Sequence, residues 1–335
     1  MKKIFILLTL VFLFSCKKQA NTVQSYHGKA LGTTYSIQFF NKKQLDLETG
    51  IDSVFQAVNK SISTYQENSD ISKINRGEQV QIDSIFREVF VLSQDIYRKT
   101  NGYFDPTVGN LVNAYGFGPE GRNKSAAEIP LKKLMLSVGL DKVSINGDNL
   151  IQKENPGVYL DFNAIGKGYA VDQLSNFLSK LNIENYLVEV GGEIFAHGKN
   201  RSDSKAWKIG IDSPEESSQD RELANVITLK NKALATSGNY RKYRIDSASG
   251  EKFVHTVNPK TGQAQKSNLL SVSVIATDCA TADAFATAFM AMGFEKAKES
   301  SSTQKGISVY FIYAKNGQSK TYFSEGFKSK IVEKG

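Results

Sequence analysis

Hydrophobic and polar residues along the chain follow two periods, one typical of strands and the other typical of helices. Residues 33–40 are β-branched and aromatic, which favours a strand. Apolar residues then recur at helical spacing, at Ile51, Val54, Phe55, Val58 and Ile62. The same spacing returns in residues 83–100, where Gly102 is placed to end the helix. This part of the chain therefore predicts a strand followed by two helices.

The remaining segments mix strands and helices without a regular alternation. Asn146 and Gly147 separate two short apolar runs within residues 142–153, a pattern that favours a hairpin. Next come a strand (158–162), a glycine-containing loop, a helix (168–181) and a strand interrupted by two glycines (186–196). Further strands are predicted at 207–211, 226–229, 252–257, 269–276 and 307–313. We therefore predict an α+β fold of mixed, mainly antiparallel sheets with packed helices, rather than a doubly wound parallel sheet.

The N-terminal residues have the layout of a secretory signal. Two lysines precede an apolar run, residues 4–14, that is much shorter than the roughly 20 residues of a membrane-spanning helix. The segment that ends at Cys16 resembles the lipobox of bacterial lipoproteins, in which the cysteine thiol is acylated. We predict a lipoprotein signal peptide at 1–15, a flexible tether at 16–27 and a folded domain at 28–335. The alternative is an ordinary secreted protein without a lipid.

Composition limits the classes of partner. With 40% hydrophobic residues the chain can bury a sizeable core, and its two cysteines leave no disulfide if Cys16 carries lipid. The formal net charge is +8, but Lys and Arg are scattered along the chain and do not cluster with aromatic residues. This distribution argues against a nucleic-acid partner and is compatible with substrates that carry phosphate.

A helical segment in the C-terminal third contains a candidate metal site. On a helix, Phe285, Phe289 and Met292 share one face, whereas Asp283 and Thr287 lie together on the opposite one. A carboxylate beside a hydroxyl offers hard oxygen ligands, which suit Mg²⁺. The alternative is that this pair is solvated helix surface or part of a helix cap.

Residues 160–169, LDFNAIGKGY, form a candidate phosphate site. A strand is expected to end after Asp161, and a loop with Gly166 and Gly168 leads into a helix with Lys167 at its start. Glycines let backbone N–H groups approach an anion, and a helix N-terminus adds a partial positive charge. The spacing matches neither a P-loop nor a dinucleotide-binding fingerprint, so a plain strand-to-helix turn is the alternative.

Two further segments offer a base and a surface for a flat ring. His255 closes an apolar strand and is the best candidate for a general base, although a lone strand histidine is usually structural. Residues 101–118 are dense in glycine and aromatic residues, so they could hold a planar ring while Asp105 fixes a polar edge. The alternative is a buried aromatic turn in which Asp105 bonds its own backbone.

Eight motifs are spread along nearly all of the mature chain. In chain order they are LGTTY (31–35), STY with SDISKIN (63–65 and 69–75), GYFDPTVGNLVNAYGFG (102–118), LDFNAIGKGYAVD (160–172), LVEVGGEIFAHG (187–198), ATSGNYRKY (235–243), HTVNPKTG (255–262) and ATDCATADAFATAFMAMG (276–293). Their wording and their order closely resemble the FAD:protein FMN transferase (ApbE) family, in which a lipoprotein signal is also common.

The resemblance implies an α+β fold related to the tunnelling fold, Mg²⁺ as cofactor and FAD as the donor of FMN. It also implies that the acceptor is a Thr or Ser of an envelope electron-transfer protein. By motif position, Asp283, Thr287 and the backbone carbonyl of Ala164 would bind the metal, and His255 and Asp283 would be catalytic, His255 taking the acceptor's hydroxyl proton. Contacts with FAD would come from Leu31, Tyr65, Tyr103, Phe104, Asp105, Asp161, Lys167 and Val257.

The sequence departs from the family at two positions and leaves alternative functions open. Leu31 and Asn258 stand where the family often has methionine and aspartate, and both changes are mild. We expect the protein in the cell envelope, lipid-anchored to an inner or outer membrane and facing the periplasm. The alternatives are a Mg²⁺-dependent FAD pyrophosphatase, in which water replaces the acceptor hydroxyl, and a non-catalytic flavin-binding lipoprotein.

Overall fold

The computed structural model describes residues 22–121, 129–214, 222–238, 243–245, 252–264 and 267–334. The predicted signal peptide and Cys16 lie outside these residues. The predicted tether is wrong from residue 22 onward, because Thr22–Ala30 forms strand β1 and pairs along its length with β2 (Thr33–Asn41). The Tyr26 hydroxyl fixes this strand by donating to the carbonyl of Leu45 at 2.8 Å.

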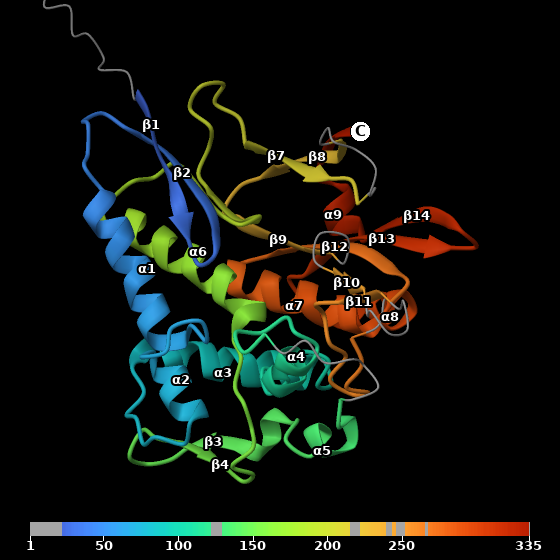
Figure 1. Cartoon of the computed structure of the whole chain (residues 1–335). Coiled ribbons are helices and arrows are strands. Elements are labelled where there is room, and N and C mark those ends of the chain that lie inside the picture. The colour runs from blue at the N-terminus through green and yellow to red at the C-terminus, as the bar shows by residue number, and fades with distance from the viewer. Residues whose placement is uncertain are drawn as a thin grey trace, which may run out of the picture.

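The centre of the fold is an eight-stranded sheet whose neighbouring strands are all antiparallel (Figure 1). Tyr186, Val188 and Val190 show why these segments form strands, since every second side chain is buried. The prediction of an α+β fold with mainly antiparallel sheets is confirmed. In spatial order the sheet contains β1, β2, β5 (Tyr186–Val190), β6 (Glu193–His197), β9 (Lys232–Gly238), β12 (Leu269–Ala276), β13 (Ser308–Lys315) and β14 (Gln318–Phe323).

Helices cover one face of this sheet. The helices α6 (Asn163–Lys180) and α7 (Cys279–Met292) lie side by side against it, and α1 (Glu48–Ile62) and α3 (Ser84–Lys99) pack on them (Figure 1). The Ala-rich helix α7 is buried on almost every side. The two faces that the sequence distinguishes, one with Phe285 and the other with Asp283, are therefore both buried, because small side chains let the sheet and the neighbouring helices approach α7 closely.

A smaller sheet covers the opposite face. It contains β15 (Ile331–Lys334), β8 (Leu223–Leu229) and β7 (Trp207–Asp212) in that order. A second hydrophobic core lies between the two sheets and includes Trp207, Ile227 and Ile275. The short helix α9 (Glu325–Lys328) contributes Phe327 to the same core. The helices and the small sheet therefore lie on opposite faces of the large sheet.

Short elements complete the helical side of the molecule. They are α2 (Asp70–Asn75), α4 (Gly109–Ala114), α5 (Leu131–Met135), α8 (Phe294–Thr303) and the two-stranded sheets β3–β4 (Val143–Ile145 and Ile151–Lys153) and β10–β11 (Tyr243–Ile245 and Lys252–Val254). The hairpin predicted around Asn146 and Gly147 is confirmed. A third small core, which includes Leu111 and Val257, joins α4 to the segment after β11.

Two further sequence-based boundaries, at residues 158–162 and 186–196, are wrong. Residues 158–162 form only an isolated bridge, in which Tyr159 pairs with Val108, because this segment crosses from β4 to α6 beside a loop rather than beside a strand. The predicted single strand 186–196 is a hairpin, since Gly191 and Gly192 take positive φ values and reverse the chain between β5 and β6. Among helices of the described ranges, none is both long and apolar enough to cross a membrane.

Candidate active site

The candidate site is built where α6 and α7 approach each other most closely. A Cβ atom on Gly168 would lie 2.3 Å from the Cys279 carbonyl oxygen, so only glycine permits this distance between the helices. The Gly168 amide donates to Asp283 Oδ2 at 3.1 Å. Asp283 is only 3% exposed. The alternative of a solvated Asp283 is therefore excluded, and the carboxylate is held inside the structure against α6.

A buried group of charges surrounds Asp283. Lys167 Nζ lies 2.6 Å from Glu193 Oε1, and the Glu193 side chain is 4% exposed. Burial alone would lower the pKa of Lys167, but the charges of Asp283 and Glu193 outweigh it and raise that pKa. Burial raises the pKa of Glu193 to about 7 and raises the pKa of Asp283, with Lys167 acting against both shifts. The site therefore combines one ammonium group, paired with Glu193, and a second carboxylate, Asp283, on which its charge acts.

Lys167 is not at a helix start. Helix α6 begins at Asn163, so Lys167 lies in its second turn and the two glycines beside it are helical. The predicted glycine loop is wrong because Gly168 serves the contact with α7 and does not form a turn. At the actual helix start, Asp161 Oδ1 accepts a hydrogen bond from the Asn163 amide at 2.7 Å, and burial raises the pKa of Asp161.

Two acidic residues of this region are not among the predicted site residues, although both lie within the family motifs. Asp172 accepts hydrogen bonds from the amides of Cys279 and Ala280, each at 2.8 Å, and so caps the start of α7. Burial raises the pKa of Asp172 to about 7. The other residue is Glu193, the first residue of β6. A carboxylate directly after two glycines, at the start of an apolar strand, was the available signal for Glu193.

The residues expected to bind Mg²⁺ lie close together. In a regular α-helix the Gly168 amide points at the carbonyl of Ala164, four residues earlier. The same amide donates to Asp283 Oδ2, so the Asp283 carboxylate lies next to the Ala164 carbonyl. Thr287 lies one turn after Asp283, and its Oγ1 is 3.4 Å from Ser237 Oγ on β9. Mg²⁺ needs only one or two carboxylates besides waters and phosphate oxygens. This donor set fits the ion, even though the described part of the chain holds no cluster of three or more His, Cys, Asp or Glu side chains arranged for a metal.

Several of the predicted flavin contacts gather around the start of α6. The Asp161 amide donates to the Pro106 carbonyl at 2.7 Å, which joins the loop before α4 to this helix. The Tyr65 hydroxyl donates to the Phe117 carbonyl at 3.3 Å. Burial is the main cause that raises the pKa of Tyr65, and the charge of nearby Asp161 is the second. Tyr65 is 59% exposed, so its ring is open to a ligand.

The aromatic loop departs from expectation at two residues. The Phe104 ring is fully buried in the main core, so its side chain does not provide a face for a planar ligand. Asp105 accepts hydrogen bonds from the amide and the hydroxyl of Thr107 at 2.8 and 2.6 Å, which is the alternative in which it stabilises its own turn. Tyr103 remains half-buried, and its hydroxyl accepts a hydrogen bond from Lys296 at 2.9 Å. Of the two aromatic residues that this loop was expected to offer to FAD, Tyr103 is therefore the one whose side chain a ligand could reach.

The segment of His255 lies directly after β11. His255 is half-buried, and Val257 is buried in the third core beside Leu111. Asn258 donates from Nδ2 to the Ala291 carbonyl at 3.2 Å, which ties this segment to the C-terminal end of α7. The backbone of the candidate base is therefore joined to the helix that carries the candidate metal ligands.

Leu31 lies at the same end of the sheet as Glu193. Leu31 and Gly32 both have positive φ, as a two-residue hairpin between β1 and β2 requires. The Gly191 amide donates to the Thr34 carbonyl at 3.0 Å, so this hairpin touches the turn that precedes Glu193. Leu31 is half-buried and packs on the main core.

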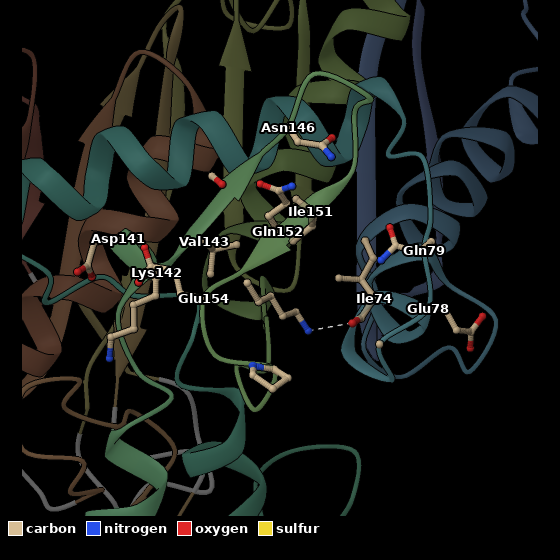
Figure 2. A pocket seen from close by; sticks show the side chains of 14 residues that line it. Ile74, Glu78, Gln79, Asp141, Lys142, Val143, Asn146, Ile151, Gln152 and Glu154 are labelled. Atoms are coloured by element: carbon tan, nitrogen blue, oxygen red, sulfur yellow. Dashed lines mark hydrogen bonds between the residues drawn. The ribbon is translucent and has the colours of Figure 1, made fainter.

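A separate pocket lies away from these residues. It has a volume of about 630 Å³ and opens between the C-terminal end of α2 and the β3–β4 hairpin (Figure 2). Ile74 and Glu78 line one side, and Val143 and Gln152 line the other. Burial lowers the pKa of Lys153 to about 8, and its Nζ donates to the Ile74 carbonyl at 2.8 Å. The pocket contains none of the predicted site residues, so the candidate chemistry lies at the α6–α7 contact instead.

Comparisons with known proteins place the chain in a family. The profile of the ApbE family matches residues 31–311. A relative from Haemophilus influenzae, named FAD:protein FMN transferase, is 34% identical over 96% of this chain and 94% of its own length. A relative of the same name from Vibrio cholerae is 34% identical over 96% of each chain.

A solved structure gives the same result for the fold. The structure titled flavin transferase ApbE from Vibrio cholerae superimposes with a TM-score of 0.81 at 33% identity, covering 92% of this chain and all of that chain. The resemblance stated from the motifs is confirmed, because both the sequence and the fold match along nearly the whole length. The chain belongs to the ApbE family.

Proposed function

We propose that the protein is a Mg²⁺-dependent enzyme that transfers FMN from FAD to a Thr or Ser hydroxyl of another protein and releases AMP. The observation that carries this proposal is the buried Asp283, held between the Gly168 amide and the charge of Lys167 where α6 meets α7. Family membership supports the same reaction, since the relatives carry the name FAD:protein FMN transferase.

The charges of the site suit the cleavage of a pyrophosphate. Breaking this bond develops negative charge on the transferred phosphoryl group and on departing AMP. Asp283, Thr287 and the Ala164 carbonyl would hold Mg²⁺, which offsets that charge when it is bound. The Lys167 ammonium stays protonated at neutral pH, because the neighbouring carboxylates raise its pKa, and it attracts phosphate oxygens.

The remaining predicted residues would orient the two reactants. Tyr65 and Tyr103 offer rings at the surface of the site that could hold the flavin, which limits the positions that the phosphoryl group can take. The acceptor hydroxyl has a pKa far above 7 and needs a base near neutral pH to accept its proton. His255 is the proposed base, because imidazole titrates in that range and its segment is tied to α7.

Transfer of a defined mass tests the proposal. The purified mature protein, FAD, Mg²⁺ and a candidate acceptor domain should give an acceptor that is heavier by one FMN in intact-mass spectrometry, together with AMP. Free FMN formed without acceptor would instead indicate a pyrophosphatase. An unchanged acceptor with every divalent metal would reject the transferase. A His255→Ala variant that binds FAD but transfers no FMN would exclude a non-catalytic flavin-binding protein.

Replacement of the central carboxylate gives a sharper test. Asp283→Asn should lower kcat/KM by about 100- to 1000-fold, since it removes a charge that the reaction uses directly. Asp278→Asn is the matched control, because Asp278 caps the same helix through the Thr281 amide and asparagine caps equally well. Equal rates for the two variants would place the chemistry elsewhere.

The location of the protein and its acceptor also belong to this proposal. The apolar N-terminal run followed by Cys16 supports a lipid anchor in the cell envelope, facing the periplasm. An acceptor in the same compartment, such as an envelope electron-transfer protein, would be within reach of an enzyme fixed to the membrane. Expression of candidate acceptors with and without this enzyme, followed by intact-mass measurement, identifies the partner.

A further inference from the structure

Glu193 is a buried carboxylate that the proposed reaction does not yet use. It is the first residue of β6 and follows the turn at Gly191 and Gly192. Its Oε1 pairs with Lys167 Nζ at 2.6 Å. Its Oε2 is buried and has no hydrogen-bond partner within the described part of the chain.

This arrangement costs stability. Buried carboxylate oxygens are normally hydrogen-bonded, and an ion pair in the interior rarely offsets the loss of water around both groups. A neutral pair of similar shape would satisfy the fold at least as well. The position of Glu193 therefore points to a role in the site rather than in folding.

The role of Glu193 concerns the competition between Lys167 and a cation for the Asp283 carboxylate. The charge of Asp283 acts directly on Lys167, whose side chain is long and flexible and is 33% exposed. Without a competing carboxylate, the ammonium would be drawn to Asp283 and would occupy the oxygen that a cation needs. Glu193 lies on the sheet and attracts the ammonium toward the sheet instead.

We propose that Glu193 is a positioning residue that holds the Lys167 ammonium away from Asp283, so that the Asp283 carboxylate remains available to the cation. The inference rests on the proposed Mg²⁺ site. In this arrangement the ion pair between Glu193 on β6 and Lys167 on α6 keeps the two charged groups apart. Lys167 then remains available to phosphate, and Asp283 remains available to the metal.

Cation binding, measured without FAD and without acceptor, tests this inference. Isothermal titration calorimetry with Mg²⁺ should show that Glu193→Gln weakens binding by about 10- to 100-fold, as replacing a group that orients a metal ligand typically does. In a Lys167→Met background the same substitution should change binding less than about two-fold, because no ammonium is left to compete. Glu189→Gln is the matched control, since Glu189 accepts from the Gly192 amide in the same turn and should leave binding unchanged.

The two backgrounds separate positioning from direct attraction. An equal loss of Mg²⁺ affinity in both would mean that Glu193 acts on the cation itself, and the inference would be overturned. Wild-type affinity in Glu193→Gln would overturn it as well. Thermal unfolding checks that each variant folds. If Glu193→Gln does not fold, Glu193→Asp takes its place in both backgrounds. A smaller loss of Mg²⁺ affinity is then expected, and only where Lys167 is present.

The outcome is independent of whether FMN is transferred. A wild-type protein that transfers FMN, together with unaltered Mg²⁺ binding in Glu193→Gln, would reject only the role of Glu193. A wild-type protein that binds Mg²⁺ but transfers no FMN would reject the proposed function and leave the result of the binding cycle intact.

Discussion

At the scale of single residues, the site concentrates carboxylates that the fold removes from water. Asp105, Asp161 and Asp283 are all buried, and burial raises the pKa of each. Each carboxylate accepts a backbone amide hydrogen bond, from Thr107, Asn163 or Gly168, which opposes the shift. Each donor therefore favours the charged form of its carboxylate against the effect of burial, and it fixes the direction of one side chain.

The pKa of Asp105 predicts a dependence of stability on pH. Burial raises this pKa to about 6, whereas in the unfolded chain the group ionises near its usual value of about 3.9. Between these values the folded protein binds more protons than the unfolded chain, so stability falls as pH rises through this window. Relative to Asp105→Asn, the wild type should lose up to about 3 kcal/mol of unfolding free energy between pH 4 and 7, since each pKa unit corresponds to about 1.4 kcal/mol.

Urea denaturation at a series of pH values measures this difference. The other buried carboxyl groups are present in both proteins, so their contributions cancel. Asp95→Asn, on the exposed side of α3, is the control and should follow the wild type across the range. Parallel curves for Asp105→Asn and the wild type would contradict the prediction.

At the scale of elements, the decisive feature is the contact between α6 and α7. Gly168 permits it, Asp172 caps the start of α7 across it, and Asp283 receives a hydrogen bond through it. The contact joins two segments that lie more than a hundred residues apart in the sequence. The proposed metal ligands and Lys167 therefore depend on a single helix pair for their relative positions.

Two glycines of α6 give a matched test of this contact. Gly168→Ala should cost about 1 to 3 kcal/mol and slow FMN transfer, because the added methyl group would meet the Cys279 carbonyl and push the helices apart. Gly166→Ala should be neutral or stabilising by up to about 1 kcal/mol, since its nearest neighbour, Ile62, is 3.7 Å away and alanine favours a helix. Unfolding free energies and transfer rates measure both effects. Equal stability of the two variants would show that the helices can separate without cost.

The cap on α7 makes a second prediction at this scale. Asp172→Asn keeps the size of the side chain but replaces one acceptor oxygen with an NH₂ group. One of the two backbone N–H groups that donate to Asp172, those of Cys279 and Ala280, would then face another donor. The expected loss is about 1 to 3 kcal/mol of unfolding free energy, the cost of an unpaired buried donor. Asp278→Asn, which keeps the local N-cap, should change stability by only a few tenths of a kcal/mol. Chemical denaturation of both variants at pH 8 gives the comparison.

At the scale of the whole molecule, the eight-stranded sheet separates two environments. The small sheet and α9 seal one face with an apolar core, whereas the helices on the other face carry the charged site. Strand β1 begins at Thr22 at the edge of the sheet, so only a short segment separates the proposed anchor at Cys16 from the folded body. We expect this spacing to keep the enzyme close to the membrane.

Removal of the proposed anchor tests this arrangement. Cys16→Ser should move the protein from the membrane fraction to the soluble fraction, because no acyl chain can then be attached at that residue. The transfer rate of the purified folded domain should not change, since Cys16 precedes every described element of the site. Mass spectrometry of the N-terminal peptide provides the direct measurement, and an unacylated Cys16 in the wild type would contradict the prediction.

Local patterns predicted much of the fold. The helix α1 follows from apolar residues at helical spacing, and the β3–β4 hairpin follows from the turn at Asn146 and Gly147. The sequence predicts one strand over 186–196 that is interrupted by Gly191 and Gly192, because apolar residues lie on both sides of these glycines. Only the folded chain shows that their positive φ values reverse the chain direction. Residues 22–27 lack any periodicity, and their strand depends on pairing with β2.

The sequence by itself determined the family, the classes of the main elements and the residue types of the site. These depend on local propensity and on the order of short motifs, which are properties of neighbours along the chain. Only the tertiary structure decided that Gly168 brings α6 against α7, that Phe104 is buried in the core, and that Glu193 pairs with Lys167. Burial and charge pairing arise between residues that are distant in sequence, so they exist only after the helices have packed on the sheet.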